Sequence, residues 1–313
     1  MSVEGGTRAI LAAMVANLGI AITKFFAFLV SGSSSMLAES VHSVADSGNQ
    51  MLLLIGGRRS KRAATPEHPF GYGRERYLYA FVVSIVLFAV GGLFSLYEGV
   101  HKVRHPEELT NIIVPIVVLL IAIVLEGFSL RTAVVESNKV RHGLSWVQFV
   151  RRAKAPELPV VLLEDVGALI GLVLALCGVG LTAVTGNVVW DGLGTIAIGT
   201  LLIVIAVVLG AETKSLLLGE GALPSDVAAI RAALLEGADI ERLVHMRTLF
   251  LGPEELLVAA KVSLSLSPGD SVAEVAKAIN DAEERIRAAV PVPMVIYLEP
   301  DVFRVGEGSP TVP

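Results

Sequence analysis

Six long apolar runs place the strongest limit on what this chain can fold into. A helix needs about 20 mainly apolar residues to cross a bilayer. The runs cover roughly residues 8–31, 34–56, 77–100, 111–135, 158–184 and 188–211. With 53% hydrophobic and 18% charged residues among 313, the chain is too apolar for an ordinary soluble fold. The sequence therefore predicts a polytopic α-helical integral membrane protein with six transmembrane helices, surrounded by membrane lipid.

The basic residues indicate an orientation. They fill or flank the second and fourth connections between the predicted spans: Arg58, Arg59, Lys61, Arg62, Arg74, Arg76, Arg131, Lys139, Arg141, Arg151, Arg152 and Lys154. Connections rich in lysine and arginine face the cytoplasm, so we expect both termini to be cytoplasmic and the protein to lie in the cell (inner) membrane. Met1–Gly6 has no basic residue, and we expect no cleavable signal.

The composition becomes that of a soluble domain after Leu218. We therefore divide the chain into a six-span transmembrane domain, 1–219, and a cytosolic domain, 220–313. Within the second domain the patterns predict a helix capped by Ser225, two strands, a Pro268–Gly269 turn, a helix with a Ser271/Glu274 capping box, and a last strand. The helices are expected to end near Glu236 and Ala289, and the strands cover roughly 240–251, 256–266 and 294–298. This αββαβ order suits a small two-layer α/β sandwich.

Ionisable residues interrupt the second apolar run. Glu39, His42 and Asp46 lie within Ala38–Gln50, and an ionisable group in hydrocarbon costs about 2.5 kcal/mol or more unless it has a partner, a wet cavity or a ligand. His42 and Asp46 are four residues apart, which places them on one helix face about 6 Å along the axis. An imidazole and a carboxylate in this arrangement form half of a site for a divalent cation.

Several motifs together resemble the cation diffusion facilitators. They are His42-xxx-Asp46, HPFGYGRERY (His68–Tyr77), VHMRT (Val244–Thr248), YLEPD (Tyr297–Asp301) and the αββαβ tail. The resemblance implies a homodimer with a ferredoxin-like cytosolic dimerisation domain. It also implies proton-coupled export of divalent transition metals, usually zinc, from the cytosol by alternating access.

The resemblance further implies a tetrahedral site that combines His42 and Asp46 with a His-xxx-Asp pair on the fifth span. Asp165 matches the aspartate of that pair, but Val161 occupies the histidine position. Glu164–Asp165 resembles the branch related to the mitochondrial zinc transporters of animals. At about 1.5 Å per residue in a core of about 30 Å, Asp46 and Asp165 lie at similar depths. We therefore predict that His42, Asp46 and Asp165 converge.

The ligand missing at Val161 leaves alternatives open. Glu164, Glu39 or water can complete the set, and Asn17 and Asn49 would suit a harder ion such as Mn²⁺. Glu164 lies about 100° around the helix from Asp165, so it is the less direct candidate. Both asparagines are also explained by hydrogen bonds between helices.

Two further family sites are expected to be weak or lost. His68 matches a ligand in the cytosolic loop, but Tyr72 follows four residues later, so His68 is interpreted as a structural residue or a weak site. The tail retains His245. Its other expected ligand positions are Lys261, Ala276 and Tyr297, which are poor cation ligands at neutral pH. We therefore expect the tail to dimerise rather than to sense metal.

The remaining features of the runs have simpler interpretations. The single cysteine, Cys177, permits no intrachain disulfide or CxxC site. Gly192, Gly194 and Gly199 favour close helix packing. Other charges in the runs are Lys24, Glu98, Glu126, Asp191 and Glu212. Snorkelling towards the membrane surface explains those near the ends of runs.

The sequence thus favours a dimeric, proton-coupled exporter of a divalent metal, with zinc first and iron, manganese or cobalt behind. One alternative is a transport-impaired pseudo-transporter that acts as a regulatory or structural partner, and Val161 is the residue that favours it. Another is a proton-coupled transporter of a different solute. No nucleophile–base arrangement or phosphate loop indicates an enzyme. We expect no prosthetic group and no nucleic-acid partner.

Overall fold

The computed structural model describes residues 3–141, 143–265 and 271–301, with side chains from residue 17 onward. The chain forms two compact units. The first comprises residues 1–59 and 75–214, and the second comprises residues 60–74 and 215–313.

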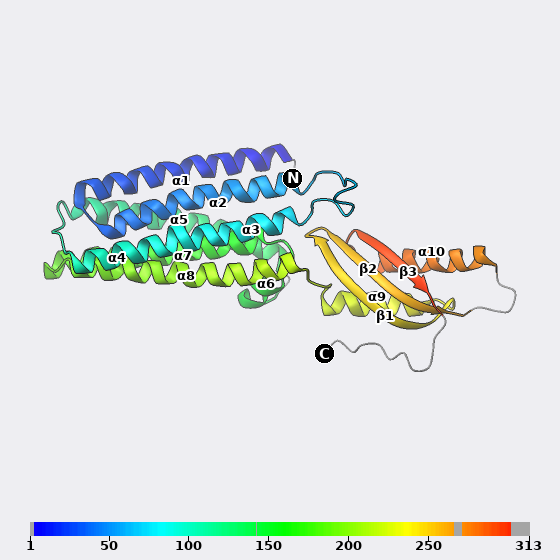
Figure 1. Cartoon of the computed structure of the whole chain (residues 1–313). Helices are drawn as coiled ribbons and strands as arrows, with labels where there is room; N and C mark the ends of the chain where they lie inside the picture. Colours follow the sequence, from blue (N-terminus) through cyan, green and yellow to red (C-terminus); the bar gives the residue numbers. More distant parts are fainter. Residues whose placement is uncertain (1–2, 142, 266–270, 302–313) are drawn as a thin grey trace. The chain divides into compact units, whose positions relative to one another are not determined.

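The first unit is a bundle of long helices (Figure 1). Its elements are α1 (Val3–Ser31), α2 (Ser34–Arg59), α3 (Glu75–Val86), the π-helix η1 (Leu87–Leu93), α4 (Phe94–Arg104), α5 (Ile113–Val140), α6 (Trp146–Arg152), α7 (Glu157–Thr185) and α8 (Val189–Leu218). The third apolar run forms one continuous helical rod, in which η1 separates α3 from α4. Among the described residues, four helices are long and apolar enough to cross a membrane: Glu75–Arg104, Ile113–Val140, Glu157–Thr185 and Val189–Leu218.

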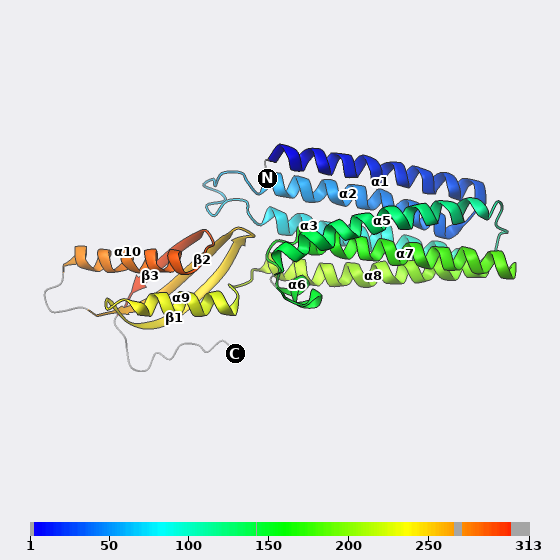
Figure 2. The ribbon, with the colours of Figure 1, turned by 180° about the vertical axis from the view of Figure 1, so that it is seen from behind.

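The most polar of the long helices lies inside the bundle. Helix α2 packs against α1, α3, η1, α4 and α7, and its buried residues include serines, a glutamate, a histidine and an aspartate. Helix α5, by contrast, is strongly apolar in its first half and mostly exposed, and it contacts α1 and α7 (Figure 2). Because polar side chains are costly in hydrocarbon, the neighbouring helices shield those of α2 from lipid.

A buried carboxylate holds the beginning of α2. Asp191, in the first turn of α8, is 0% exposed and accepts hydrogen bonds from Ser33 Oγ (2.8 Å), Ser34 N (2.7 Å) and Ser34 Oγ (3.0 Å). A negative charge at a helix N-terminus satisfies free N–H groups and complements the helix dipole. Snorkelling is therefore the wrong explanation for Asp191, because its side chain turns inward to cap α2.

The second unit contains α9 (Pro224–Glu236), β1 (Ile240–Gly252), β2 (Glu255–Leu264), α10 (Val272–Ala289) and β3 (Met294–Pro300). The predicted αββαβ order is confirmed. β2 is the central strand of the sheet, antiparallel to β1 and parallel to β3. Ile230 and Leu234 of α9 and Ile286 of α10 join the strand residues in one apolar core.

The helix ends of this unit follow local chemistry. Ser271 and Glu274 form the predicted capping box, in which Ser271 Oγ accepts from Glu274 N at 3.4 Å and Glu274 Oε2 accepts from Ser271 N at 2.6 Å. The prediction that Ser225 caps α9 is wrong. Leu223 is the cap residue and Pro224 takes the first helical position, where its missing N–H has no cost. The predicted Pro268–Gly269 turn lies outside the described residues.

The loop that connects α2 to α3 belongs to this second unit. Thr65 and His68 exchange two backbone hydrogen bonds, of 3.0 and 3.2 Å. Gly73 lies against the turn between β1 and β2, where a Cβ atom would come within 2.8 Å of Leu251 O and 3.0 Å of Gly252 Cα. The close approach of two backbones explains a glycine at this position of HPFGYGR.

Candidate metal site

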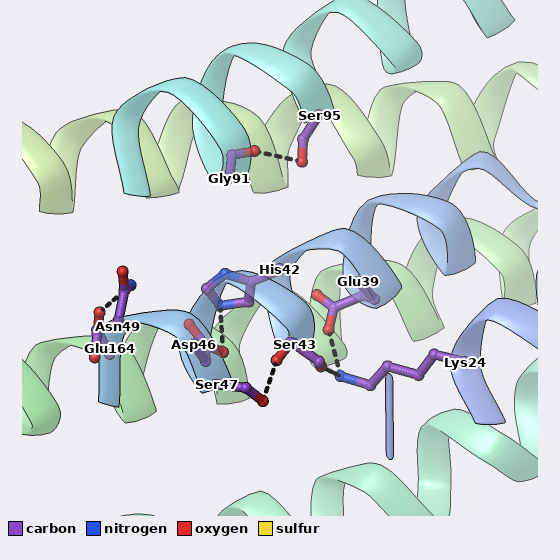
Figure 3. Close-up of polar contacts among 10 residues, drawn as sticks. All are labelled: Lys24, Glu39, His42, Ser43, Asp46, Ser47, Asn49, Gly91, Ser95 and Glu164. Atoms are coloured by element: carbon purple, nitrogen blue, oxygen red, sulfur yellow. Dashed lines mark hydrogen bonds and ion pairs between the residues drawn. The ribbon is translucent and has the colours of Figure 1, made fainter. Parts of the chain in front are cut away.

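Four polar side chains follow one another along the inner face of α2. Glu39, His42, Asp46 and Asn49 recur at intervals of three or four residues, and each is at most 9% exposed. This spacing places them on one side of a helix. The inner face of α2 is therefore a row of buried donors and acceptors (Figure 3).

His42 and Asp46 form the centre of this row. His42 Nε2 lies 3.5 Å from Asp46 Oδ2, which is ion-pair range. Within the described residues, no hydrogen bond reaches either ring nitrogen of His42 or Asp46 Oδ1. Gly91 of η1 lies opposite, because a Cβ built there would be 3.7 Å from His42 Nδ1. Buried polar atoms without partners are expensive. A bound cation would satisfy Asp46 Oδ1 and the unprotonated ring nitrogen of His42, whereas the protonated ring nitrogen requires an acceptor such as water.

Glu39 has a partner that sequence reasoning missed. Lys24 Nζ of α1 donates to Glu39 Oε2 at 3.0 Å and to Ser43 Oγ at 2.9 Å (Figure 3). Both charged side chains are 0% exposed. Snorkelling is therefore wrong for Lys24 as well. The signal that could have revealed the pair was a single lysine in the first apolar run and an extra carboxylate in the second.

The two adjacent carboxylates of α7 point to different helices. Glu164 is buried and accepts a 2.7 Å hydrogen bond from Asn49 Nδ2 of α2. Asp165 is half-buried and accepts a 3.0 Å hydrogen bond from Ser129 Oγ of α5. The carboxylate that meets α2 in this structure is therefore Glu164.

The predicted convergence of His42, Asp46 and Asp165 is not formed in this structure. Among the described residues, no three histidine, cysteine, aspartate or glutamate side chains are grouped so as to hold a metal ion. The reason is the rotation of α7 about its axis. Val161, one turn before Asp165, packs with Ala133 of α5 and Phe149 of α6, so this side of α7 faces α5.

The other candidates lie apart from this row. Asn17 and Ser129 line a mainly apolar cavity of about 550 Å³ together with residues of α1 and α5. In the second unit, the exposed His68 ring lies 4.6 Å from the Tyr72 ring, between centroids. The two rings are tilted by 32°, and the interpretation of His68 as a structural residue or weak site stays a prediction.

A lysine lies at one of the tail positions where the resemblance expects a metal ligand. His245 of β1 pairs with Lys261 of β2 in the sheet register. Lys261 Nζ lies 2.9 Å from Asp301 Oδ2 and 3.2 Å from Glu299 Oε1. Hydrogen bonds to Asp301 and then to Glu299 raise the pKa of Lys261 above its usual value. An ammonium group already pairs with these two carboxylates.

Comparison with known proteins decides the family. A model of the cation efflux transmembrane domain matches residues 10–218, more than half of the 313-residue chain. The chain belongs to the cation diffusion facilitator family. This is a family of transporters rather than enzymes, and it accounts for the apolar helices as an integral membrane domain.

The individual relatives confirm the predicted resemblance of this chain to mitochondrial zinc transporters. The chain is 33% identical over 247 residues to "Proton-coupled zinc antiporter SLC30A9, mitochondrial" of Xenopus laevis, covering 78% of this chain and 44% of that protein. For the Homo sapiens protein of the same name the figures are 32% over 244 residues, 77% and 43%. Metal tolerance protein C4 of Arabidopsis thaliana is 28% identical over 260 residues, covering 82% of this chain and 57% of that protein. The chain therefore spans about half the length of these relatives.

Proposed function

We propose that this facilitator exports a divalent cation from the cytoplasm in exchange for protons by alternating access. Zinc is the first candidate because relatives that match more than three quarters of this chain are named as zinc antiporters, and iron, manganese and cobalt follow. The observation that carries the proposal is the buried His42–Asp46 pair, whose ring nitrogens and Oδ1 have no hydrogen-bond partner among the described residues. Imidazole and carboxylate are the donors that such cations prefer.

The proposal includes an arrangement in the membrane. We assign six spans, which are the four strongly apolar helices together with α1 and α2. We place the protein in the cell (inner) membrane, with both termini in the cytoplasm. Residues 1–219 form the transport domain. Residues 220–313 form the cytosolic, ferredoxin-like domain that joins two copies into a homodimer. The basic second and fourth connections and the αββαβ order of the tail support this assignment.

We further propose that one carboxylate of α7 completes the ligand set of His42 and Asp46. Asp165 occupies the aspartate position expected from the family resemblance, whereas Glu164 is the residue that contacts α2 through Asn49. Adjacent residues lie about 100° apart around a helix, so exchanging one carboxylate for the other requires a rotation of α7 through an angle of about that size. Such an exchange offers a means of binding the cation in one state and releasing it in another.

Charge links the cation to protons. An imidazole and two carboxylates hold a doubly charged ion when they are deprotonated and repel one another when the ion leaves. Protonation of these groups then competes with metal binding, because a ligand atom must be free of its proton to coordinate. Inward movement of protons can therefore drive outward movement of the cation.

The test is transport in liposomes that contain the purified protein. Uptake of Zn²⁺, Mn²⁺ and Fe²⁺ is followed with and without a pH gradient for the wild type and for Asp46→Asn, Glu164→Gln and Asp165→Asn. Glu212→Gln, which removes a carboxylate paired with Arg151 at 3.9 Å, is the control. We expect Asp46→Asn to lower the flux at least tenfold and the control to retain it. Of Glu164→Gln and Asp165→Asn, the variant that loses more flux identifies the third ligand.

Two outcomes contradict the proposal. Absence of flux with every ion would remove export as the function. Flux that survives Asp46→Asn and both α7 substitutions would show that the cation binds elsewhere.

A second candidate is the pseudo-transporter that acts as a regulatory or structural partner. The observation in its favour is that the described residues contain no group of three metal-binding side chains, together with Val161 in place of a histidine. This reading predicts that the purified protein moves no cation under any gradient and yet associates stably with another transporter subunit.

A further inference from the structure

A fully buried lysine lies one helical turn from the candidate site. Lys24 and Glu39 are both 0% exposed, and the 3.0 Å ion pair between them joins α1 to α2. Ser43 accepts a second hydrogen bond from the ammonium group at 2.9 Å. Removing two charges from water is expensive, and an apolar pair would often hold two helices together equally well. The pair therefore calls for an explanation beyond packing.

Glu39 would itself be a good metal ligand. It precedes His42 by three residues on the same face of α2, about 4.5 Å along the axis. One of its oxygens is taken by Lys24, while Oε1 is buried without a partner among the described residues. A Cβ atom at Gly171 would lie 2.8 Å from this oxygen, so α7 leaves space for the carboxylate. Glu39 is therefore an additional carboxylate beside the candidate site, and it is already paired with the ammonium group of Lys24.

The charge on Lys24 controls how tightly the row on α2 can hold a cation. An ammonium group has three donors and no lone pair, so it cannot become a ligand while it is charged. It neutralises Glu39 and also repels a divalent ion nearby. Without it, Glu39 would add a further carboxylate to the proposed ligand set of His42, Asp46 and one carboxylate of α7. Such a site would bind its cation tightly and release it slowly, which suits storage rather than transport.

We propose that Lys24 is a positioning residue that holds Glu39 out of the metal coordination sphere and so weakens cation binding at His42 and Asp46. This inference rests on the proposed function, because it assumes that these two residues bind the transported cation. Lys24 acts through Glu39 and does not touch the ion.

The test uses three variants of the full chain: Lys24→Gln, Glu39→Gln and the double variant. Glutamine at position 24 keeps a hydrogen-bond donor for Glu39 and Ser43 but removes the charge. Equilibrium Zn²⁺ binding to the purified protein in detergent gives the Kd, and liposome flux gives the half-saturation concentration and the maximal rate.

We expect the two single variants to change the Kd in opposite directions. Lys24→Gln frees a carboxylate beside the site and lowers the Kd about tenfold, which corresponds to about 1.4 kcal/mol, and its maximal rate falls because release slows. Glu39→Gln leaves the ammonium uncompensated beside the site and raises the Kd about tenfold. The double variant, which removes both charges, returns the Kd to within about threefold of the wild-type value.

A purely structural role predicts a different pattern. If the pair only joins α1 to α2, both single variants unfold at a lower temperature and bind Zn²⁺ equally or more weakly. That result overturns the inference while leaving the proposed function intact. If Lys24→Gln does not fold, the Kd of Glu39→Gln still decides, since an unchanged or lower value contradicts the inference. Lack of Zn²⁺ binding and flux in the wild type instead contradicts the proposed function.

Discussion

Replacing Gly199 with alanine would force α8 away from the helical rod formed by α3, η1 and α4. A Cβ atom at this position would lie 2.6 Å from Leu96 N and 2.9 Å from Gly92 O, both of which are backbone atoms that no rotamer change can move. Ordinary contacts begin at 3.4 Å, so the helices must separate by about 0.8 Å. The structure therefore confirms the close packing predicted for this glycine.

The expected cost follows from two opposing terms. Overpacking of a tight contact typically costs about 1–3 kcal/mol, and the higher helix propensity of alanine returns up to about 1 kcal/mol. The matched control is Gly127→Ala in α5, where a Cβ atom meets nothing within 4 Å, so that variant keeps only the gain. The two variants should differ in unfolding free energy by about 1–3 kcal/mol.

Thermal unfolding of the purified protein in detergent measures the difference. At about 2–4 °C per kcal/mol for a domain of this size, Gly199→Ala should unfold several degrees below Gly127→Ala. Equal midpoints for the two variants would refute the reasoning that backbone contact at this crossing requires glycine.

Two other predictions concern helix N-termini. Asp191→Asn should lower the unfolding free energy by about 2–3 kcal/mol relative to Glu212→Gln in the same thermal assay. The reason is that it removes the negative charge that accepts hydrogen bonds from the serines at the start of α2. Equal stability of the two variants would contradict that capping role. In the tail, hydrogen bonds from the Ser271 backbone and then from the Ser271 hydroxyl lower the pKa of Glu274. Ionised Glu274 therefore stabilises α10 at a pH above the unfolded-state pKa, and this stabilisation is lost as the pH falls through the lower folded-state pKa. The protection factors for hydrogen exchange in the first turn of α10 should therefore fall in acid for the wild type and for Glu284→Gln, but not for Glu274→Gln. Parallel pH profiles of protection for all three would contradict the prediction.

The order and extent of the elements could be predicted because they depend on neighbouring residues. The boundaries of α10 follow from the Ser271 capping box and from the apolar spacing up to Ala289. The αββαβ order follows from turn residues and from the alternation in β2. Neither property requires knowledge of distant parts of the chain.

The site was only partly predictable, because it depends on how each helix is turned about its axis. The spacing of His42 and Asp46 places them on one face in any α-helix. The sequence places Glu164 and Asp165 side by side, yet packing of Val161 with Ala133 and Phe149 turns Asp165 towards α5. The π-helix that brings Gly91 close to His42 also lacked a recognised sequence signal.

The sequence by itself determined that this chain crosses membranes, which family it belongs to, and that α2 carries an imidazole and a carboxylate on one face. These conclusions depend on composition and on local spacing. Only the tertiary structure decided that Lys24 pairs with Glu39, that Asp191 caps α2 and that Glu164 meets Asn49. Each of these contacts joins two different helices, and interhelical packing selects the partner because a buried charge or polar group must find one wherever the bundle places it.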